Sequence, residues 1–192
     1  VSHQHKDKLH LSIRAGDRHL LVDSGRFAYS GDLAVYRKDY GVRSRAHNVV
    51  LIDGCGQLSD SKEAEVPHFR HRVAEGFDFA IGSFTAGFDA DSHGAGAQPG
   101  HAARADALAR STHTRAMVYL RGRGWLLFDR VESPGAHRIT PLWHLHPDCT
   151  VATDDTTLRT VDADRANLRL QPLGALDWSL EVVAGQEEPA LQ

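Results

Sequence analysis

The chain has 192 residues, of which 41% are hydrophobic and 24% are charged, and its formal net charge is −3. This composition is ordinary for a globular protein with a real hydrophobic core. No stretch approaches the roughly 18 consecutive apolar residues that a membrane-spanning helix needs. There is also no long basic run interleaved with aromatic residues, which argues against a nucleic-acid-binding protein.

The small net charge conceals an asymmetry along the chain. Residues 1–50 contain nine lysines and arginines against five aspartates, whereas residues 51–192 contain thirteen basic residues against twenty acidic ones. Most of the basic residues near the N-terminus are arginines, whose planar guanidinium groups can hold carboxylate or sulfate through two parallel hydrogen bonds. The pattern suggests an anionic partner at this end, although an ordinary solvated surface would produce the same excess.

The first predicted element is a half-buried strand from Lys6 to Arg14, where polar and apolar residues alternate with a period of two. Continued backwards, the apolar face of this strand would carry His3, His5 and Asp7. Burying these groups without partners would be costly, and two imidazoles with one carboxylate are suitable ligands for a divalent metal. Two partly exposed histidines at a chain end would explain the same pattern.

Further strand patterns recur along the chain, and no long helical pattern interrupts them. These patterns, with turn residues at several joints, predict an all-β protein, an antiparallel two-sheet β-sandwich that forms one domain over residues 1–192. Residues 86–112 are rich in glycine, alanine and histidine and predict a long loop with a helical turn around 102–109. The residues expected to be mostly buried are Leu9, Leu11, Ile13, Leu21, Val49, Leu51, Val118, Leu126 and Phe128. The predicted strands cover residues 18–24, 47–53, 69–76, 78–84, 113–121, 124–131, 137–146, 156–161, 167–172 and 178–183.

Two predicted strands carry polar residues at their ends, where a rigid scaffold commonly holds functional side chains. Asp23 ends an apolar strand just before a glycine, and His47 and Asn48 begin the next apolar strand. Each has an ordinary alternative explanation, a turn for Asp23 and a turn or cap for His47 and Asn48.

Three of these stretches together resemble the C-terminal β-sandwich domain of the heparinase II/III-like polysaccharide lyases. The matching runs are HQHKDKL from residue 3, LLVDSGRFAYSGD from residue 20 and AHNVVLIDGCGQ from residue 46. A looser likeness continues through HTRAMVYLRGRGWLLFDRV to about residue 146. The specific part of the resemblance therefore covers residues 3–57.

The resemblance implies a metal site and part of a catalytic cleft. Members of this family cleave acidic polysaccharides by β-elimination, and an (α/α) toroid domain precedes the sandwich. A zinc ion, mainly structural, would be held by His5, Asp23 and His47. His3 would line the cleft and help to neutralise or protonate the substrate. By the same resemblance the protein would be periplasmic or secreted.

The resemblance also places a tyrosine from the segment after Asp23 in the cleft. Tyr40 fits best by spacing, and Tyr36 is the alternative. Arg37 and Arg43 flank Tyr40 and are expected to bind the anionic substrate. In the family the principal base and the group that neutralises the substrate carboxylate come from the toroid. The 192 residues alone are therefore expected to be inactive.

Two other classes of protein remain open at this point. A β-sandwich that only binds carbohydrate or serves as a scaffold would show the same strands. The segment that precedes Val1 would discriminate between such a module, which would follow a linker, and a lyase, which would follow a helical toroid. A cupin-like metal enzyme would also place HxH on a strand, but the glutamate that normally follows is absent here. A second HxH pair, His144 and His146, has no matching carboxylates and is expected to be structural or on the surface.

Overall fold

The computed structural model of the chain describes residues 4–24, 28–58, 69–89, 101–174, 176–187 and 190–191. Strands dominate this part of the chain, and every strand pair within it is antiparallel. The fold is all-β and sandwich-like, which confirms the predicted class. His3 lies outside the described residues, so its placement stays a prediction. No helix in the described part of the chain is long and apolar enough to cross a membrane.

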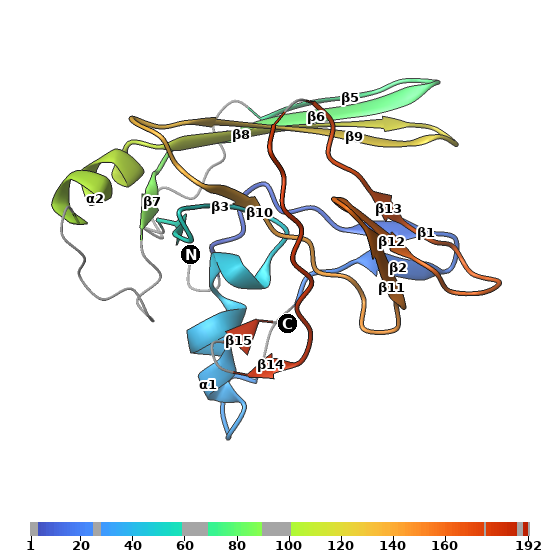
Figure 1. Ribbon diagram of the computed structural model, residues 1–192, viewed down its shortest axis with the longest axis horizontal. Helices are drawn as coiled ribbons and strands as arrows, with labels where there is room; N and C mark the ends of the chain where they lie inside the picture. Colours follow the sequence, from blue (N-terminus) through green and yellow to red (C-terminus); the bar gives the residue numbers. More distant parts are fainter. Residues whose placement is uncertain are drawn as a thin grey trace.

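The largest sheet contains four strands in the order β5-β6-β8-β9 and lies along the top of the molecule (Figure 1). Hairpins connect β5 to β6 and β8 to β9, so this sheet is built mostly from neighbours in sequence. Its strands are β5 (Arg70–Val73), β6 (Phe77–Phe84), β8 (Thr112–Leu120) and β9 (Gly124–Glu132).

Shorter strands form the layer beneath this sheet (Figure 1). β1 pairs with β2, β3 pairs with β10, and β11, β12 and β13 form a small three-stranded sheet. The bounds of these strands are β1 (Ile13–Ala15), β2 (Arg18–Leu21), β3 (Val50–Ile52), β10 (Ile139–Pro141), β11 (Val151–Asp154), β12 (Thr157–Thr160) and β13 (Arg169–Leu170).

The remaining elements are short. Two further strand pairs join β4 to β7 and β14 to β15. The bounds are β4 (Gly56–Gln57), β7 (Phe88–Asp89), β14 (Gln186–Glu187), β15 (Ala190–Leu191), α1 (Ala34–Tyr36), a π-helical turn (Arg37–Gly41), a 3-10 turn (Ser44–Ala46) and α2 (His101–Ala109).

Two apolar clusters form the core between the layers. One joins β3 to the end of β6, to β7 and to α2 through Ile52, Cys55, Phe84, Phe88 and Leu108. The other joins β1, β2 and the segment before β13 through Ile13, Leu20, Leu21 and Leu168. Since these clusters hold β2 and β3 rigidly, the residues at the ends of both strands have fixed positions.

The segment 86–112 contains regular structure at both of its described ends. β7 follows Gly87, and α2 occupies the place where a helical turn was expected. Gly87 has a φ of 88°, and a Cβ there would lie 2.3 Å from the carbonyl oxygen of Ala109 at the end of α2. Glycine is therefore required where this segment meets the helix. Residues 90–100 lie outside the described part.

The predicted strand from Lys6 to Arg14 is wrong over most of its length. Residues 4–12 are irregular, and β1 begins only at Ile13. Leu9 has a φ of 69°, which lies in the left-handed region and cannot continue a strand. The alternating pattern therefore does not decide which side chains of this segment face the interior.

Two residues expected in the core lie instead on the outer face of the four-stranded sheet. Leu126 is 37% exposed and Phe128 is 58% exposed. In the register of β8 and β9, Leu126 pairs with Val118 and Phe128 pairs with Ala116. These positions alternate along β8 with the buried Arg115, so both pairs lie on the face that is turned away from the lower layer. The alternating pattern thus predicts the strand β9 correctly but assigns its apolar residues to the wrong face.

Near the C-terminus one predicted strand is absent and one strand is present that the patterns did not predict. Residues 178–183 form no strand, and the strand β11 was not predicted. Ile13, Leu21, Val49 and Leu51 are buried as expected, whereas Leu9, Leu11 and Val118 are only partly buried.

Candidate metal centre

The strand ends of the lower layer meet at one place. Asp23 lies two residues after β2, and His47 and Asn48 lead into β3. The extended segment after β10 lies between them. On one side the N–H of Leu142 donates to the carbonyl of Val49 at 2.9 Å, and on the other side the carbonyl of His144 accepts the N–H of Val22 at 2.9 Å. Three segments that are far apart in sequence therefore meet at this edge.

His47 is the centre of this group. Its side chain is fully buried, and its Nδ1 lies 3.2 Å from Oδ2 of Asp23. Its Nε2 is also buried but has no hydrogen-bond partner among the described residues. A buried imidazole nitrogen without a partner is costly, and coordination of a metal ion would satisfy it.

Two overlapping groups of side chains around His47 can hold a metal ion. One consists of His5, Asp7 and His47, and the other of His10, Asp23 and His47, with the ligand atoms of each within 4.8 Å of one another. The rings of His5 and His47 have centroids 5.3 Å apart. His5 and Asp23 of the predicted set each lie in a group with His47, but not in the same group, and the structure adds Asp7 and His10.

The hydrogen bonds of His10 indicate its role. Its Nδ1 accepts the backbone N–H of Asn48 at 3.0 Å, so a neutral His10 carries its proton on Nε2. That nitrogen lies 3.0 Å from Oγ of Ser12 and 3.7 Å from Oδ2 of Asp23. Since a ligand nitrogen must be unprotonated, His10 in this arrangement supports Asp23 rather than coordinating an ion.

Sequence reasoning missed His10. In the expected strand, His10 fell on the polar side with Lys6, Lys8 and Ser12, opposite to His5. The left-handed turn at Leu9 changes the direction of the chain and brings His10 to the same cluster as His5. No residue type in this segment signals that turn, because leucine seldom adopts a positive φ.

The histidines near His47 are held neutral. Burial lowers the pKa of His5, and the nearby His47 and Arg37 lower it further. Burial also lowers the pKa of His10, against the opposing effect of Asp23. Neutral imidazoles are the form that binds a metal ion, so the site favours the ligand form near neutral pH.

Asn48 ties the segments of the site together. Its side-chain amide donates to the carbonyls of Leu11 at 2.9 Å and Val22 at 3.0 Å. Its Oδ1 accepts the backbone N–H of His144 at 2.6 Å and lies 3.1 Å from Nδ1 of the same residue. Because Asn48 is fully buried, these hydrogen bonds compete with no solvent and fix the neighbours of His10 and Asp23.

Tyr40 and His144 lie behind this group. Tyr40 is 2% exposed, and its hydroxyl lies 3.2 Å from Nε2 of His144. Burial lowers the pKa of His144 to about 4, so His144 is neutral and donates through Nδ1 to Asn48. Its expected structural role is confirmed, and His146, with a side chain 38% exposed, is on the surface as expected.

The other residues predicted for the cleft lie nearby on α1 and the turns after it. Tyr36 is 36% exposed. The guanidinium of Arg37 lies 4.5 Å above the ring of Tyr29. Arg43 is half-buried, and its backbone N–H donates to the carbonyl of Tyr40 at 2.7 Å. Tyr36 is therefore more accessible than Tyr40.

The irregular segment that carries His5 and Asp7 is held by buried side chains from the lower layer. Oγ of Ser44 donates to the carbonyl of Lys6 at 2.8 Å. The amide of Gln57 accepts the N–H of Lys8 at 2.8 Å and donates to its carbonyl at 2.7 Å, as a neighbouring strand would. The segment therefore has a fixed path without being a strand.

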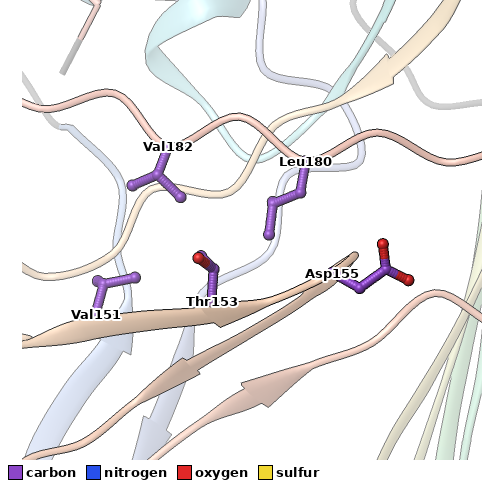
Figure 2. Close-up of a pocket in the computed structure, with 5 residues that line it drawn as sticks. All are labelled: Val151, Thr153, Asp155, Leu180 and Val182. Atoms are coloured by element: carbon purple, nitrogen blue, oxygen red, sulfur yellow. The ribbon is translucent and has the colours of Figure 1, made fainter.

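The described residues also form a groove elsewhere, between β11 and the extended segment that follows β13. Figure 2 shows the side chains of Val151, Thr153, Asp155, Leu180 and Val182 around it, and its volume is about 290 Å³. It contains one carboxylate and neither a histidine nor an aromatic ring. This groove is a poor candidate for catalysis or sugar stacking.

Comparison with models of known protein families shows which family the chain belongs to. The family model described as "Heparinase II/III-like, C-terminal" matches residues 1–190. The chain belongs to the heparinase II/III-like C-terminal family. The match extends well past residue 146, where the recognisable motifs end, so the small sheet β11-β12-β13 is part of the same heparinase-like domain. Membership of this family points to polysaccharide lyases. No match was found among curated proteins.

Proposed function

We propose that this chain is the metal-binding sandwich domain of a lyase that cleaves uronic-acid-containing polysaccharides by β-elimination, together with an upstream toroid domain. The observation that carries the proposal is the orphaned Nε2 of the fully buried His47, within a group of histidines and carboxylates. Within the described residues, Nε of Arg37 and Nδ1 of His113 are also buried without a hydrogen-bond partner, but of these three residues only His47 lies in a group of possible metal ligands.

The proposed metal is zinc, held by His5, Asp23 and His47. Two neutral imidazoles and one carboxylate form a donor set that suits zinc. When bound, zinc would mainly cross-link the segment before β1, the end of β2 and the start of β3. The orphaned nitrogen and the lowered pKa of His5 support this assignment.

The groups of this chain would contribute only part of the reaction. In β-elimination a base removes the proton beside the uronate carboxylate, the electron pair forms a carbon–carbon double bond, and the bond to the glycosidic oxygen breaks. The leaving oxygen then takes a proton from an acid. We assign His3 to this protonation, or to neutralisation of the substrate, and Arg37 and Arg43 to binding of its anionic groups.

Tyr40 and Tyr36 are the candidates for the tyrosine of the cleft. Tyr40 fits the spacing better, but its hydroxyl is buried against His144, and any effect on substrate would pass through that histidine. Tyr36 is exposed beside Arg37 and can touch a polymer chain directly. Both substitutions are therefore needed to assign the role.

A domain that binds carbohydrate or serves as a scaffold without catalysis is the second candidate. It is favoured by one observation: the hydroxyl of Tyr40 is buried against His144 and so does not face a substrate directly. In that case the metal would serve stability alone.

Turnover by the protein that carries the upstream toroid would separate the two candidates. Lyase action creates an unsaturated uronate that absorbs ultraviolet light, so alginate, heparan, chondroitin and hyaluronan can be screened directly. We expect turnover on one of these polymers and its loss in His3→Ala, while the exposed control His146→Ala remains active. Binding of a polymer without turnover would favour the non-catalytic module.

A further inference from the structure

Arg115 on β8 connects the four-stranded sheet to the metal centre. It is only 5% exposed, and its Nη1 donates to the carbonyl of Leu9 at 2.9 Å and to that of Asn48 at 2.6 Å. Leu9 directly precedes His10, and Asn48 directly follows His47. One nitrogen therefore holds the backbone beside two histidines of the site.

The rest of the guanidinium is fixed from the opposite side. Nε and Nη2 of Arg115 donate to the two carboxylate oxygens of Asp129 on β9, at 2.7 and 3.1 Å. The buried His113 lies 2.7 Å from the same carboxylate through Nε2. Burial raises the pKa of Asp129, but hydrogen bonds from His113 and Arg115 outweigh this effect and hold the pKa below its usual value. The carboxylate stays charged, and the planar fork fixes the direction of Nη1.

The contact with Leu9 has a particular consequence for the centre. Leu9 adopts a φ of 69°, a conformation that leucine avoids unless its surroundings impose it. The same turn brings His10 within 3.7 Å of Asp23. Holding the carbonyl of Leu9 therefore stabilises the orientation of the group that supports Asp23.

We propose that Arg115, oriented by Asp129, is a positioning residue that sets the metal affinity of the centre. The inference rests on the proposed metal site and goes beyond it, since neither residue is placed to coordinate an ion. Loss of the fork would free the backbone at Leu9 and at Asn48 together, so His10, Asp23 and His47 would lose their fixed geometry. Supporting residues of this kind typically change metal affinity by about 10- to 100-fold.

Arg18 offers a matched control on β2. It is also 5% exposed, pairs with Asp162 at 2.8 Å and donates to the carbonyl of Asp148 at 3.2 Å. Its contacts join β2 to the small sheet and involve no residue of the metal centre. Arg115→Lys and Arg18→Lys thus each remove a buried guanidinium that holds a carboxylate and backbone carbonyls, although Arg18 contacts Asp162 through one nitrogen only.

The test measures zinc affinity by competition with a chromophoric chelator, and the melting temperature of the metal-free protein. We expect both lysine variants to melt at lower temperature, while only Arg115→Lys binds zinc at least about 10-fold more weakly. Asp129→Asn, which keeps the shape of the side chain, should weaken zinc binding in the same direction. It also provides a second reading if Arg115→Lys does not fold.

Cobalt substitution adds a readout that stability alone would not change. The visible absorption of bound Co²⁺ reports the ligand geometry, so Arg115→Lys should alter this spectrum and Arg18→Lys should not. If Arg115→Lys and Asp129→Asn both keep the zinc affinity and the cobalt spectrum of the wild type, this inference is overturned while the proposed metal centre stands. A wild-type protein that binds neither ion would overturn the metal centre, and this inference with it.

Discussion

The backbone N–H of Asn48 donates to Nδ1 of His10 at 3.0 Å, and this single contact fixes where the proton of His10 lies. With Nδ1 accepting, the other ring nitrogen carries the proton and faces Ser12 and Asp23. His10 and His47 are therefore neighbours with different roles. His10 supports a carboxylate, and His47 offers a buried nitrogen that needs a partner.

The first prediction separates these two roles. His47→Ala should abolish zinc binding, because it removes a ligand, whereas His10→Gln should weaken it by about 10- to 100-fold, because it removes support for Asp23. Isothermal titration of metal-free protein with zinc measures both. His146→Gln, on the surface, is the control and should bind like wild type. Equal losses in His10→Gln and His47→Ala would show that His10 is itself a ligand.

The second prediction concerns stability. A metal that binds only the folded state stabilises it by about 2.7 kcal/mol when its free concentration is 100 times its dissociation constant. Zinc should therefore raise the melting temperature of the wild type, and chelation should reverse the rise. His5→Ala should remove this zinc-dependent increase while leaving the metal-free melting temperature close to that of wild type, since His5 is only partly buried. An unchanged zinc effect in His5→Ala would contradict its assignment as a ligand.

The third prediction concerns the pH dependence of the metal-free protein. The pKa of His144 is about 4 in the folded state and near 6.5 in the unfolded chain. As the pH falls from about 6.5 to 4, the unfolded chain binds a proton that the folded protein does not, so the free energy of unfolding decreases. The full effect is on the order of 3 kcal/mol. Urea unfolding at several pH values should therefore show a decline over this window that is smaller in His144→Gln.

The fourth prediction separates the two tyrosines. Tyr40→Phe removes a buried hydroxyl that contacts His144 and should cost about 1 kcal/mol in the free energy of unfolding. Tyr36 is 36% exposed as a residue, so Tyr36→Phe should lower the free energy of unfolding less than Tyr40→Phe. Turnover by the protein with its upstream toroid then assigns the cleft residue. If Tyr40→Phe lowers turnover more than its loss of folded protein explains, the assignment made from spacing stands.

The sequence predicted the class of fold well, because hydrophobic alternation is a local property of a strand. β6, β8 and β9 lie where strand patterns were predicted, and Leu21 of β2 and Leu51 of β3 are buried as expected. The pattern could not say which face of β9 meets the lower layer. That depends on the ion pair between the buried Arg115 and Asp129, which places charged residues on the inner face and Phe128 on the outer one.

The candidate site was predictable only where motifs carried it. Asp23 and His47 occupy strand ends, and the structure places them 3.2 Å apart. The path of residues 4–12 depends on the turn at Leu9 and on hydrogen bonds from Gln57, which lies about 50 residues later in the chain. Tertiary contacts of this kind leave no local signal, so both the false strand and the omission of His10 have the same physical cause.

The most direct test of this account is an anomalous diffraction map, recorded at the zinc absorption edge from crystals of protein purified without chelators. The account predicts one strong peak that is coordinated by His5, Asp23 and Nε2 of His47, with His10 outside coordination distance. A map without a peak in this region, or a peak coordinated by His10 or by Asp7 in place of Asp23, would contradict it.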